Sequence, residues 1–252
     1  MCDPFGPVYE HKRFVHFHDC DRFLRLSVPG VLRFFEEAAL QQSEALGVGF
    51  AHYLEHRVGW LLSRWDVRFR SVPSFGQAVT VRTQPRRFRG FSANRHFEIL
   101  APDLSLHVEG FSQWIYVDTE RMRPCRVPPL MAERYRMTKA EGPLPWEGDV
   151  TEPDREDHHA VFRVRRGDID LNGHVNNIGY VEWALESLPE EVADRHRLER
   201  LVVHYRGQTR LGAELRAAVQ VDPADGGLRA LHRISEGDRV ACLLETRWRP
   251  AS

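Results

Sequence analysis

One ten-residue stretch of the sequence concentrates side chains that could take part in catalysis. Asp170, Asn172 and His174 alternate with other residues, so in an extended or turning backbone their side chains would face the same side. A carboxylate can act as a general base, a carboxamide as a hydrogen-bond donor and an imidazole as a proton shuttle. We therefore expect these three groups to converge on one substrate atom.

Two asparagines, Asn176 and Asn177, follow this group and precede an amphipathic segment. Their side chains can satisfy backbone N–H groups at the start of a helix, while the remaining N–H groups and the positive end of the helix dipole would face a negatively charged oxygen. An Asx-rich turn that only caps a helix is the alternative interpretation. Such a cap does not require a histidine two residues before it, which favours a functional site.

The stretch lies in the second of two similar parts of the chain. Asp19 corresponds to Asp168, 149 positions later, and at the same offset Gly30 corresponds to Gly179. Further on, Phe69 corresponds to Tyr205 at an offset of 136. Matches in the same order indicate an internal duplication, and the falling offset indicates shorter connections in the second copy.

A composition change separates the two copies. The segment 141–157 contains prolines, glycines and acidic residues with little periodicity, which is typical of a linker. We expect an N-terminal domain over residues 8–140 and a C-terminal domain over residues 158–252.

Each copy predicts a buried helix. In the first, Ser27 is a suitable cap and Gly47 a suitable end. In the second, the helix is expected to begin near Asn176 and to end at Pro189. The apolar positions of the first helix have the spacing of a buried stripe and are Val31, Phe34, Phe35 and Ala38. Those of the second are Val181, Ala184, Leu185 and Leu188.

Runs rich in β-branched and aromatic residues predict the strands. They cover Trp60–Arg70, Ala78–Thr83, Ser92–Leu100 and His107–Val117 in the first copy, and Leu201–Tyr205, Glu214–Val221, Leu228–Ile234 and Arg239–Arg249 in the second. In addition, the segments that begin at Phe14 and Phe162 are expected to be strands that run into an Asp-x-Asp turn. One helix with several antiparallel strands in each copy is an α+β arrangement.

Composition excludes several classes of protein. The 252 residues are 42% hydrophobic with a formal net charge of -1, which fits a globular core and argues against bulk nucleic-acid binding. There is no apolar run long enough to span a membrane and no export signal at Met1, so we expect a soluble, cytoplasmic protein. The four scattered cysteines argue against a zinc ribbon or a thioredoxin-like motif, and no metal site is expected.

The stretch from Asp168 to Trp183, DIDLNGHVNNIGYVEW, resembles the signature of the acyl-acyl-carrier-protein thioesterases, which are plant plastid enzymes with bacterial relatives. The resemblance extends to Tyr205, Trp65 and Trp114, and so covers most of the chain. It implies a tandem hotdog fold, in which two antiparallel sheets each wrap round a long central helix. It also implies hydrolysis of a fatty acyl thioester on the phosphopantetheine arm of an acyl carrier protein, without cofactor or metal.

The resemblance places the catalytic groups on Asp170, Asn172 and His174. The family's further acidic residue and its adjacent cysteine fall on Gln208 and Thr209, which are both departures. Because Thr209 has no readily ionised sulfur, a thiol nucleophile cannot operate there. We expect Asp170 to act as a general base on water or as the nucleophile, with Gln208 positioning the water.

Substrate binding is expected to involve Asn176 and Asn177 together with the apolar helix stripe of the first copy. In the resemblance that copy supplies the acyl-chain pocket, through Val31, Phe34, Phe35 and Ala38, although each of these could equally be plain core.

Several alternatives stay open. The chain could hydrolyse an acyl-CoA, bind acyl thioesters without catalysis, or act as a hotdog hydratase. The oligomeric state is open as well, and a homodimer is one alternative.

Overall fold

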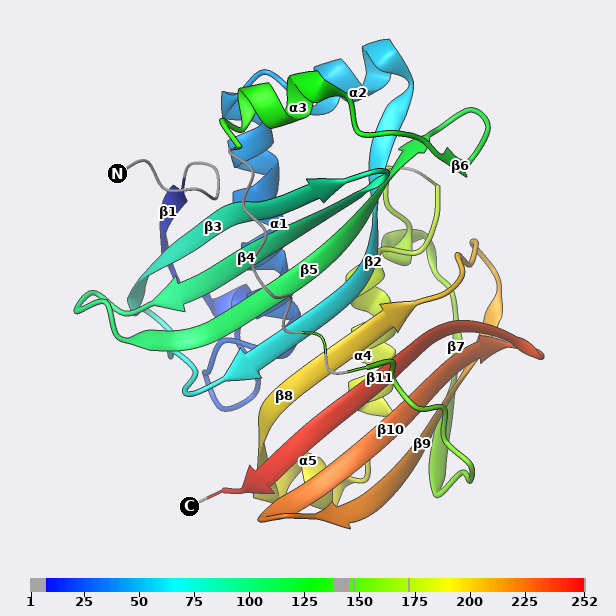
Figure 1. Ribbon diagram of the computed structural model, residues 1–252. Helices are drawn as coiled ribbons and strands as arrows, with labels where there is room; N and C mark the ends of the chain where they lie inside the picture. The colour runs from blue at the N-terminus through cyan, green and yellow to red at the C-terminus, as the bar shows by residue number, and fades with distance from the viewer. Residues whose placement is uncertain (1–7, 138–145, 147, 172, 252) are drawn as a thin grey trace. The chain divides into compact units, whose positions relative to one another are not determined.

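The computed structural model describes residues 8–137, 146, 148–171 and 173–251. Across these residues a large antiparallel sheet with few helices forms an α+β fold, as predicted (Figure 1). The described residues group into two compact units. The first contains the residues up to Ser63 and those from Phe69 to Met137, and the second contains Arg64–Arg68 and the residues from Trp146 onward.

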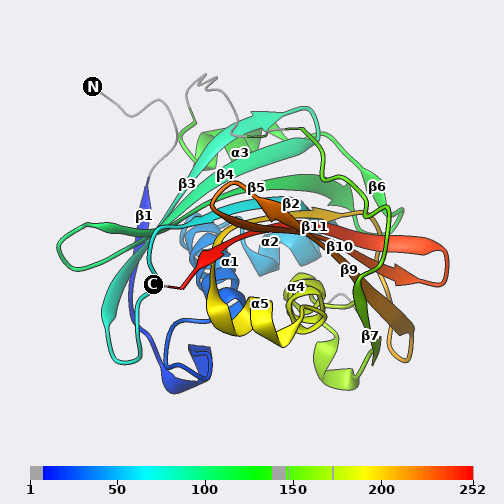
Figure 2. The same ribbon diagram turned by 90° about the horizontal axis from the view of Figure 1, so that it is seen from below.

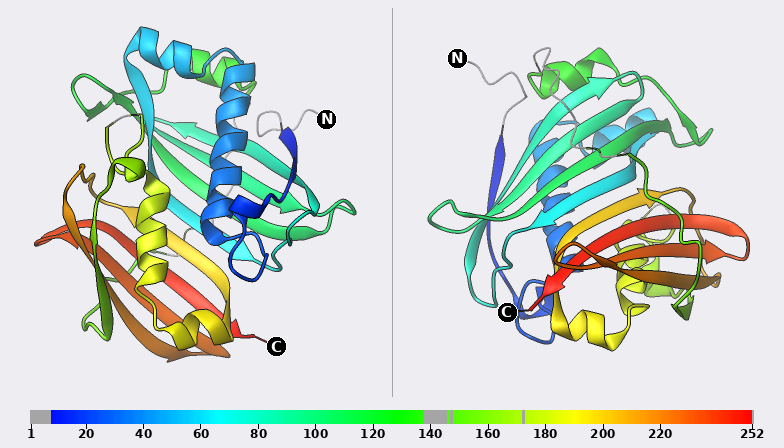
Figure 3. Two further views of the ribbon diagram at one scale, coloured as in Figure 1. Left: turned by 180° about the vertical axis from the view of Figure 1, so that it is seen from behind. Right: turned by 60° about the horizontal axis from the view of Figure 1, so that its bottom comes forward.

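In the first unit, a long helix lies across one face of the strands (Figure 3, left). The strand order is β1-β3-β4-β5-β2. Its elements are β1 (Tyr9–Phe14), η1 (Phe17–Asp19), α1 (Val28–Ala45), α2 (Phe50–His56), β2 (Val58–Phe69), β3 (Ala78–Arg89), β4 (Ser92–Leu100), β5 (Leu106–Asp118), β6 (Arg123–Pro124) and α3 (Pro129–Arg134).

The helix α1 forms as the sequence predicts. The Ser27 side chain accepts the backbone N–H of Gly30 at 3.1 Å, and a proline occupies the first turn, where its missing N–H is not needed. The helix ends at Ala45, and Gly47 adopts a φ of 69°, which suits glycine. The four stripe residues are at most 1% exposed: Val31, Phe34, Phe35 and Ala38.

The second unit repeats this plan with a shorter helix. Its elements are β7 (His158–Arg163), η2 (Arg166–Asp168), α4 (Asn177–Glu186), α5 (Glu190–Arg195), β8 (His196–Tyr205), β9 (Glu214–Ala224), β10 (Gly227–Glu236) and β11 (Arg239–Pro250). The strand order is β8-β11-β10-β9-β7. Both α4 and α5 lie on one side of β8–β11 (Figure 2).

In the second unit, Arg64–Arg68 of β2 pairs with β8. Two sequence expectations need correction. A long central helix was expected in each copy, but α4 has only 10 residues because Ser187 caps it before Pro189. The segments that begin at Phe14 and Phe162 do not continue as strands into the Asp-x-Asp turn, because the 3-10 turns η1 and η2 intervene.

No helix in the described parts of the chain combines the length and the apolar character needed to cross a membrane.

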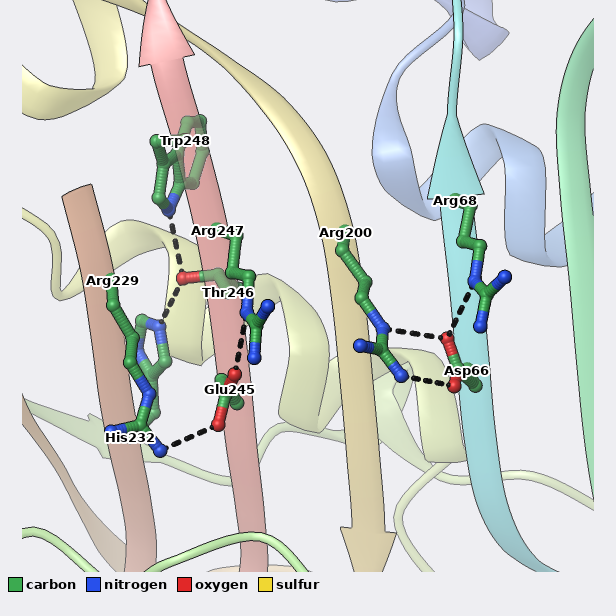
Figure 4. A network of polar contacts seen from close by, with 9 residues as sticks. All are labelled: Asp66, Arg68, Arg200, Arg229, His232, Glu245, Thr246, Arg247 and Trp248. Carbon is green, nitrogen blue, oxygen red and sulfur yellow. Dashed lines mark hydrogen bonds and ion pairs between the residues drawn. The ribbon is translucent and has the colours of Figure 1, made fainter. Parts of the chain in front are cut away.

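A buried ion pair joins β2 to β8 in the second unit (Figure 4). The guanidinium of Arg200 donates to both carboxylate oxygens of Asp66, at 3.0 and 2.7 Å, and the Asp66 side chain is fully buried. Two parallel bonds of this kind fix geometry as well as charge, so the register of β2 on β8 is held by a bidentate contact.

A second polar group lies in the core of the same unit. His232 is buried, its Nε2 lies 2.9 Å from Oγ1 of Thr246, and Nε1 of Trp248 donates to the same hydroxyl at 2.8 Å (Figure 4). Burial lowers the pKa of His232 to about 3, because the charged imidazolium would lose its hydration.

The duplicated glycines allow a matched test of helix packing. A Cβ on Gly30 would lie 2.6 Å from the backbone oxygen of Asp19, whereas a Cβ on Gly179 would meet only ordinary contacts, the nearest at 3.5 Å. We expect Gly30→Ala to lower the free energy of unfolding by about 1–3 kcal/mol and Gly179→Ala to raise it by about 0.5–1 kcal/mol. Urea denaturation measures both, and equal effects of the two changes would contradict the packing argument.

The buried histidine predicts a pH dependence of stability. The unfolded chain protonates this histidine near pH 6.5, and the folded chain only near pH 3. The contribution of the neutral histidine to the free energy of unfolding is therefore complete above about pH 6.5 and decreases as the pH falls toward 3. At pH 4 the free energy of unfolding has decreased by roughly 3 kcal/mol because of this group. We expect urea denaturation at pH 7 and pH 4 to show a smaller decrease for His232→Gln than for the natural chain. The same decrease in both would show that His232 does not contribute.

Candidate active site

The segment between η2 and α4 is a loop that we call the site loop, and its described residues are 169–171 and 173–176. The backbone carbonyl of Asp168 accepts the N–H of Asn176 at 2.8 Å, and the N–H of Asp170 donates to the carbonyl of His174 at 2.8 Å. Gly173 turns the chain with a φ of 76°, which a side chain would strain. These bonds bring Asp170 and His174 opposite each other at the start of α4.

The base of the loop is held by an ion pair. The backbone N–H and the guanidinium of Arg165 donate to the carboxylate of Asp168, with the shortest contacts at 2.7 and 2.8 Å. These bonds lower the pKa of Asp168, so this carboxylate is a fixed anion rather than a candidate base. Asp170, the next acidic residue along the chain, stays the candidate base.

Asp170 and His174 are both half-buried, and the N–H of His174 donates to Oδ1 of Asp170 at 3.3 Å. Nδ1 of His174 is buried and has no hydrogen-bond partner among the described residues. Leaving a buried nitrogen unbonded costs about 1–3 kcal/mol, so the position favours a water molecule or a substrate atom. The convergence of the Asp170 carboxylate and the His174 imidazole on one substrate atom stays a prediction.

Asn172, the third residue predicted for this group, lies outside the described residues.

The two asparagines at the start of α4 differ in what they do. Oδ1 of Asn176 accepts the N–H of Ile178 at 2.9 Å, so Asn176 is the helix cap. Asn177 is the first helical residue, and its backbone carbonyl accepts the hydroxyl of Tyr205 at 3.1 Å. The first turn of any helix leaves backbone N–H groups without intrahelical partners, which can stabilise a negative charge.

The segment with the two departures from the family pattern lies beside the site loop. The backbone carbonyl of Thr209 accepts the N–H of Val175 at 3.1 Å. Gln208 is half-buried, and its backbone carbonyl accepts a hydrogen bond from Nη1 of Arg239 at 2.8 Å. The Thr209 side chain is fully buried and lies 2.8 Å from the hydroxyl of Tyr180. Gln208 is thus next to the loop, while Thr209 faces the core.

The first unit contains the same loop with different chemistry. The N–H of Ser27 donates to the carbonyl of Asp19 at 2.9 Å, and that of Asp21 to the carbonyl of Arg25 at 2.7 Å. Arg25 then binds the Asp21 carboxylate through Nε and Nη2, at 3.2 and 3.0 Å. The carboxylate that corresponds to Asp170 is therefore neutralised by an arginine in the place of His174.

The residues predicted to line an acyl-chain pocket all belong to the first unit. They are buried in its core, where the rings of Phe35 and Phe97 pack at 4.9 Å. The site loop belongs to the second unit. The role of this stripe in substrate binding stays a prediction.

Sequence reasoning did not assign a site role to Tyr180 or Tyr205. A signal was available for Tyr180, because a tyrosine on the buried face of a helix needs a partner for its hydroxyl.

In the described residues no group of three or more histidine, cysteine, aspartate and glutamate side chains is arranged to hold a metal ion.

Comparison with known proteins identifies two matching sequence families. Residues 6–135 match the acyl-ACP thioesterase N-terminal domain and residues 151–250 match the acyl-ACP thioesterase C-terminal domain. A chloroplastic dodecanoyl-[acyl-carrier-protein] hydrolase of Cinnamomum camphora is 23% identical over 98% of this chain and 70% of that protein. The chain spans between 58% and 70% of the length of the curated relatives it matches.

Solved structures show the same fold. One from Lactobacillus plantarum aligns with a TM-score of 0.92 at 23% identity and covers 98% of both chains. The 12:0-ACP thioesterase from Umbellularia californica aligns with a TM-score of 0.87 at 19% identity and covers 97% of this chain and 94% of that one.

Proposed function

Because the chain belongs to the acyl-ACP thioesterase family, we propose that it hydrolyses fatty acyl-acyl-carrier-protein to a free fatty acid and the carrier thiol. The observation that carries the proposal is the site loop of the second unit. There the half-buried carboxylate of Asp170 accepts the backbone N–H of His174, whose imidazole has a buried nitrogen without a partner among the described residues, while the same loop in the first unit holds an ion pair.

In the mechanism that we propose, Asp170 accepts a proton from the attacking water. Attack of the carboxylate itself on the thioester carbonyl is the alternative. The N–H groups of Ile178 and Gly179 already donate to Asn176. The backbone N–H of Asn177 at the start of α4 and the Asn172 amide therefore stabilise the oxyanion, and Gln208 orients the water. His174 takes this proton from Asp170 and passes it to the leaving thiolate, which restores the Asp170 carboxylate. A thiol is a good leaving group, so stabilisation of the oxyanion contributes more than protonation of sulfur.

The finer description of the fold belongs to the same proposal. We take the two units as tandem hotdog domains, over residues 8–140 and 158–252, joined by 141–157. The first domain would hold the acyl chain along Val31, Phe34, Phe35 and Ala38. Support comes from the repeated loop and helix of the two units and from the resemblance in fold to the solved structures.

The implied partner is an acyl carrier protein that carries an acyl-phosphopantetheine. The name of the Cinnamomum relative supports this class of substrate. A cytoplasmic location, a homodimer and the lack of a nucleic-acid or membrane partner stay predictions from the sequence.

The internal duplication provides a matched control for the catalytic carboxylate. We expect Asp170→Asn to lower kcat with acyl-carrier substrates by about 10²–10⁴-fold, because an amide cannot accept the proton of water. Asp21→Asn, the same change in the first unit, should leave kcat within about twofold, because the Asp21 carboxylate is engaged by Arg25. His174→Ala should reduce kcat as well. Near-normal turnover by Asp170→Asn would rule out Asp170 as base or nucleophile.

The assay also separates the rival functions. One acyl chain is presented on the carrier protein and on coenzyme A, and thiol release is followed for both. A higher kcat/KM for the carrier form supports the proposal, and a higher value for the CoA form supports an acyl-CoA thioesterase. Gln208 and Thr209 replace the family's acidic residue and cysteine, which is a reason to test for binding without hydrolysis as well. Tight binding of acyl carrier protein without thiol release would indicate a binding protein.

A further inference from the structure

Three hydroxyl-bearing side chains surround the site loop, and their counterparts in the first unit lack hydroxyls. At the offsets of the duplication, Tyr180 corresponds to Val31, Thr209 to Pro73 and Tyr205 to Phe69. We call Tyr180, Thr209 and Tyr205 the hydroxyl clamp.

The backbone beneath the clamp is the same in both units. The N–H of Val175 donates to the carbonyl of Thr209 at 3.1 Å, and the N–H of Leu26 donates to the carbonyl of Pro73 at 2.8 Å. The first unit therefore keeps this contact with no hydroxyl at the corresponding positions. The fold does not need the hydroxyls to close the loop, and their presence in the second unit calls for another explanation.

Tyr180 and Thr209 are joined by two bonds. The Tyr180 hydroxyl lies 2.8 Å from Oγ1 of Thr209 and accepts the N–H of Thr209 at 3.1 Å. Both side chains are at most 2% exposed. Burial raises the pKa of Tyr180, so the hydroxyl stays protonated and can donate to Oγ1. A buried two-bond contact fixes the backbone of residue 209 relative to α4.

The contact between Tyr180 and Thr209 also restrains the backbone of Gln208, the residue before Thr209. The peptide group that links Gln208 to Thr209 is held at both of its polar groups: its carbonyl accepts Nη1 of Arg239 at 2.8 Å, and its N–H donates to the Tyr180 hydroxyl at 3.1 Å. The orientation of this peptide, and with it the backbone on the C-terminal side of Gln208, is thereby restrained. Tyr205 adds a restraint on the helix start, because its hydroxyl donates to the carbonyl of Asn177 at 3.1 Å.

We propose that the hydroxyl clamp is a set of positioning residues for the hydrolytic reaction. It fixes the Gln208 peptide and the first residue of α4 relative to Asp170 and His174, so that water and oxyanion are held in one geometry. The position at which the family has a cysteine thus serves to hold the backbone here. This inference rests on the proposed function.

The test uses changes that remove a hydroxyl and keep the shape of the side chain. We expect Tyr180→Phe and Thr209→Val each to lower kcat about tenfold or more with KM within about twofold, because misplacement of the water and oxyanion affects the chemical step. Thr209→Ser keeps a hydroxyl and should restore most of kcat. The double variant should be little worse than Tyr180→Phe alone, because Tyr180→Phe already removes both bonds, whereas Thr209→Val removes only the bond between the two hydroxyls.

A control separates positioning from stability. Thr83 of the first unit is a buried threonine whose hydroxyl donates to the carbonyl of His96 at 3.2 Å. The same hydroxyl accepts Nη1 of the buried Arg95 at 3.2 Å. We expect Thr83→Val to lower Tm at least as much as Thr209→Val does and to leave kcat unchanged. If Thr209→Val and Tyr180→Phe lower Tm but leave kcat unchanged, the clamp is only structural and the inference is wrong.

A second readout does not depend on turnover. Amide hydrogen exchange at Thr209 and Val175 should accelerate in Tyr180→Phe and stay slow in Thr83→Val. Unchanged exchange at both amides would overturn the clamp even for a chain that does not hydrolyse acyl-carrier substrates. Absence of hydrolysis in the natural chain would instead overturn the proposed function, so the two failures are distinguishable.

Discussion

The site depends on one constraint, which is the closure of a short loop by backbone hydrogen bonds between a 3-10 turn and the helix that follows it. In both units the aspartate that ends the 3-10 turn accepts the N–H of the helix cap, Ser27 in the first and Asn176 in the second. The backbone therefore presents two side chains across the loop whatever their chemistry. Asp21 with Arg25 makes an ion pair, and Asp170 with His174 makes a candidate base and proton donor. A difference of few residues converts a structural turn into a site.

The sequence predicted the elements whose signals are local. Ser92–Leu100 is β4 residue for residue, and α1 has the predicted cap, stripe and end. Elements that depend on distant contacts were not predicted. The short helices α2 and α3 have no side-chain cap, and Tyr53 and Met131 from them pack in a cluster with Val48 and Tyr116. The strand from Ala78 was predicted to stop at Thr83, but β3 continues past Pro85, where a register shift accommodates the proline.

The same distinction applies to the site. The alternating spacing of Asp170 and His174 predicts that their side chains face the same side, and their joint role stays a prediction. In the structure a backbone hydrogen bond joins the two residues across the loop. The contact of Tyr180 with Thr209 joins residues 29 positions apart on different elements, and periodicity contains no information about such a pair. The placement of Gln208 beside the loop also required the fold, since it follows from the bond between Val175 and Thr209.

The strand β2 has a consequence for how the chain can be divided. Arg64–Arg68 is encoded in the first half of the sequence, yet it groups with the second unit and supplies Asp66 to Arg200. A polypeptide that begins at the linker would lack this strand, so the edge of β8 would be open to pairing with other chains and Arg200 would lose its carboxylate. The second unit therefore depends on five residues that the first half of the sequence encodes.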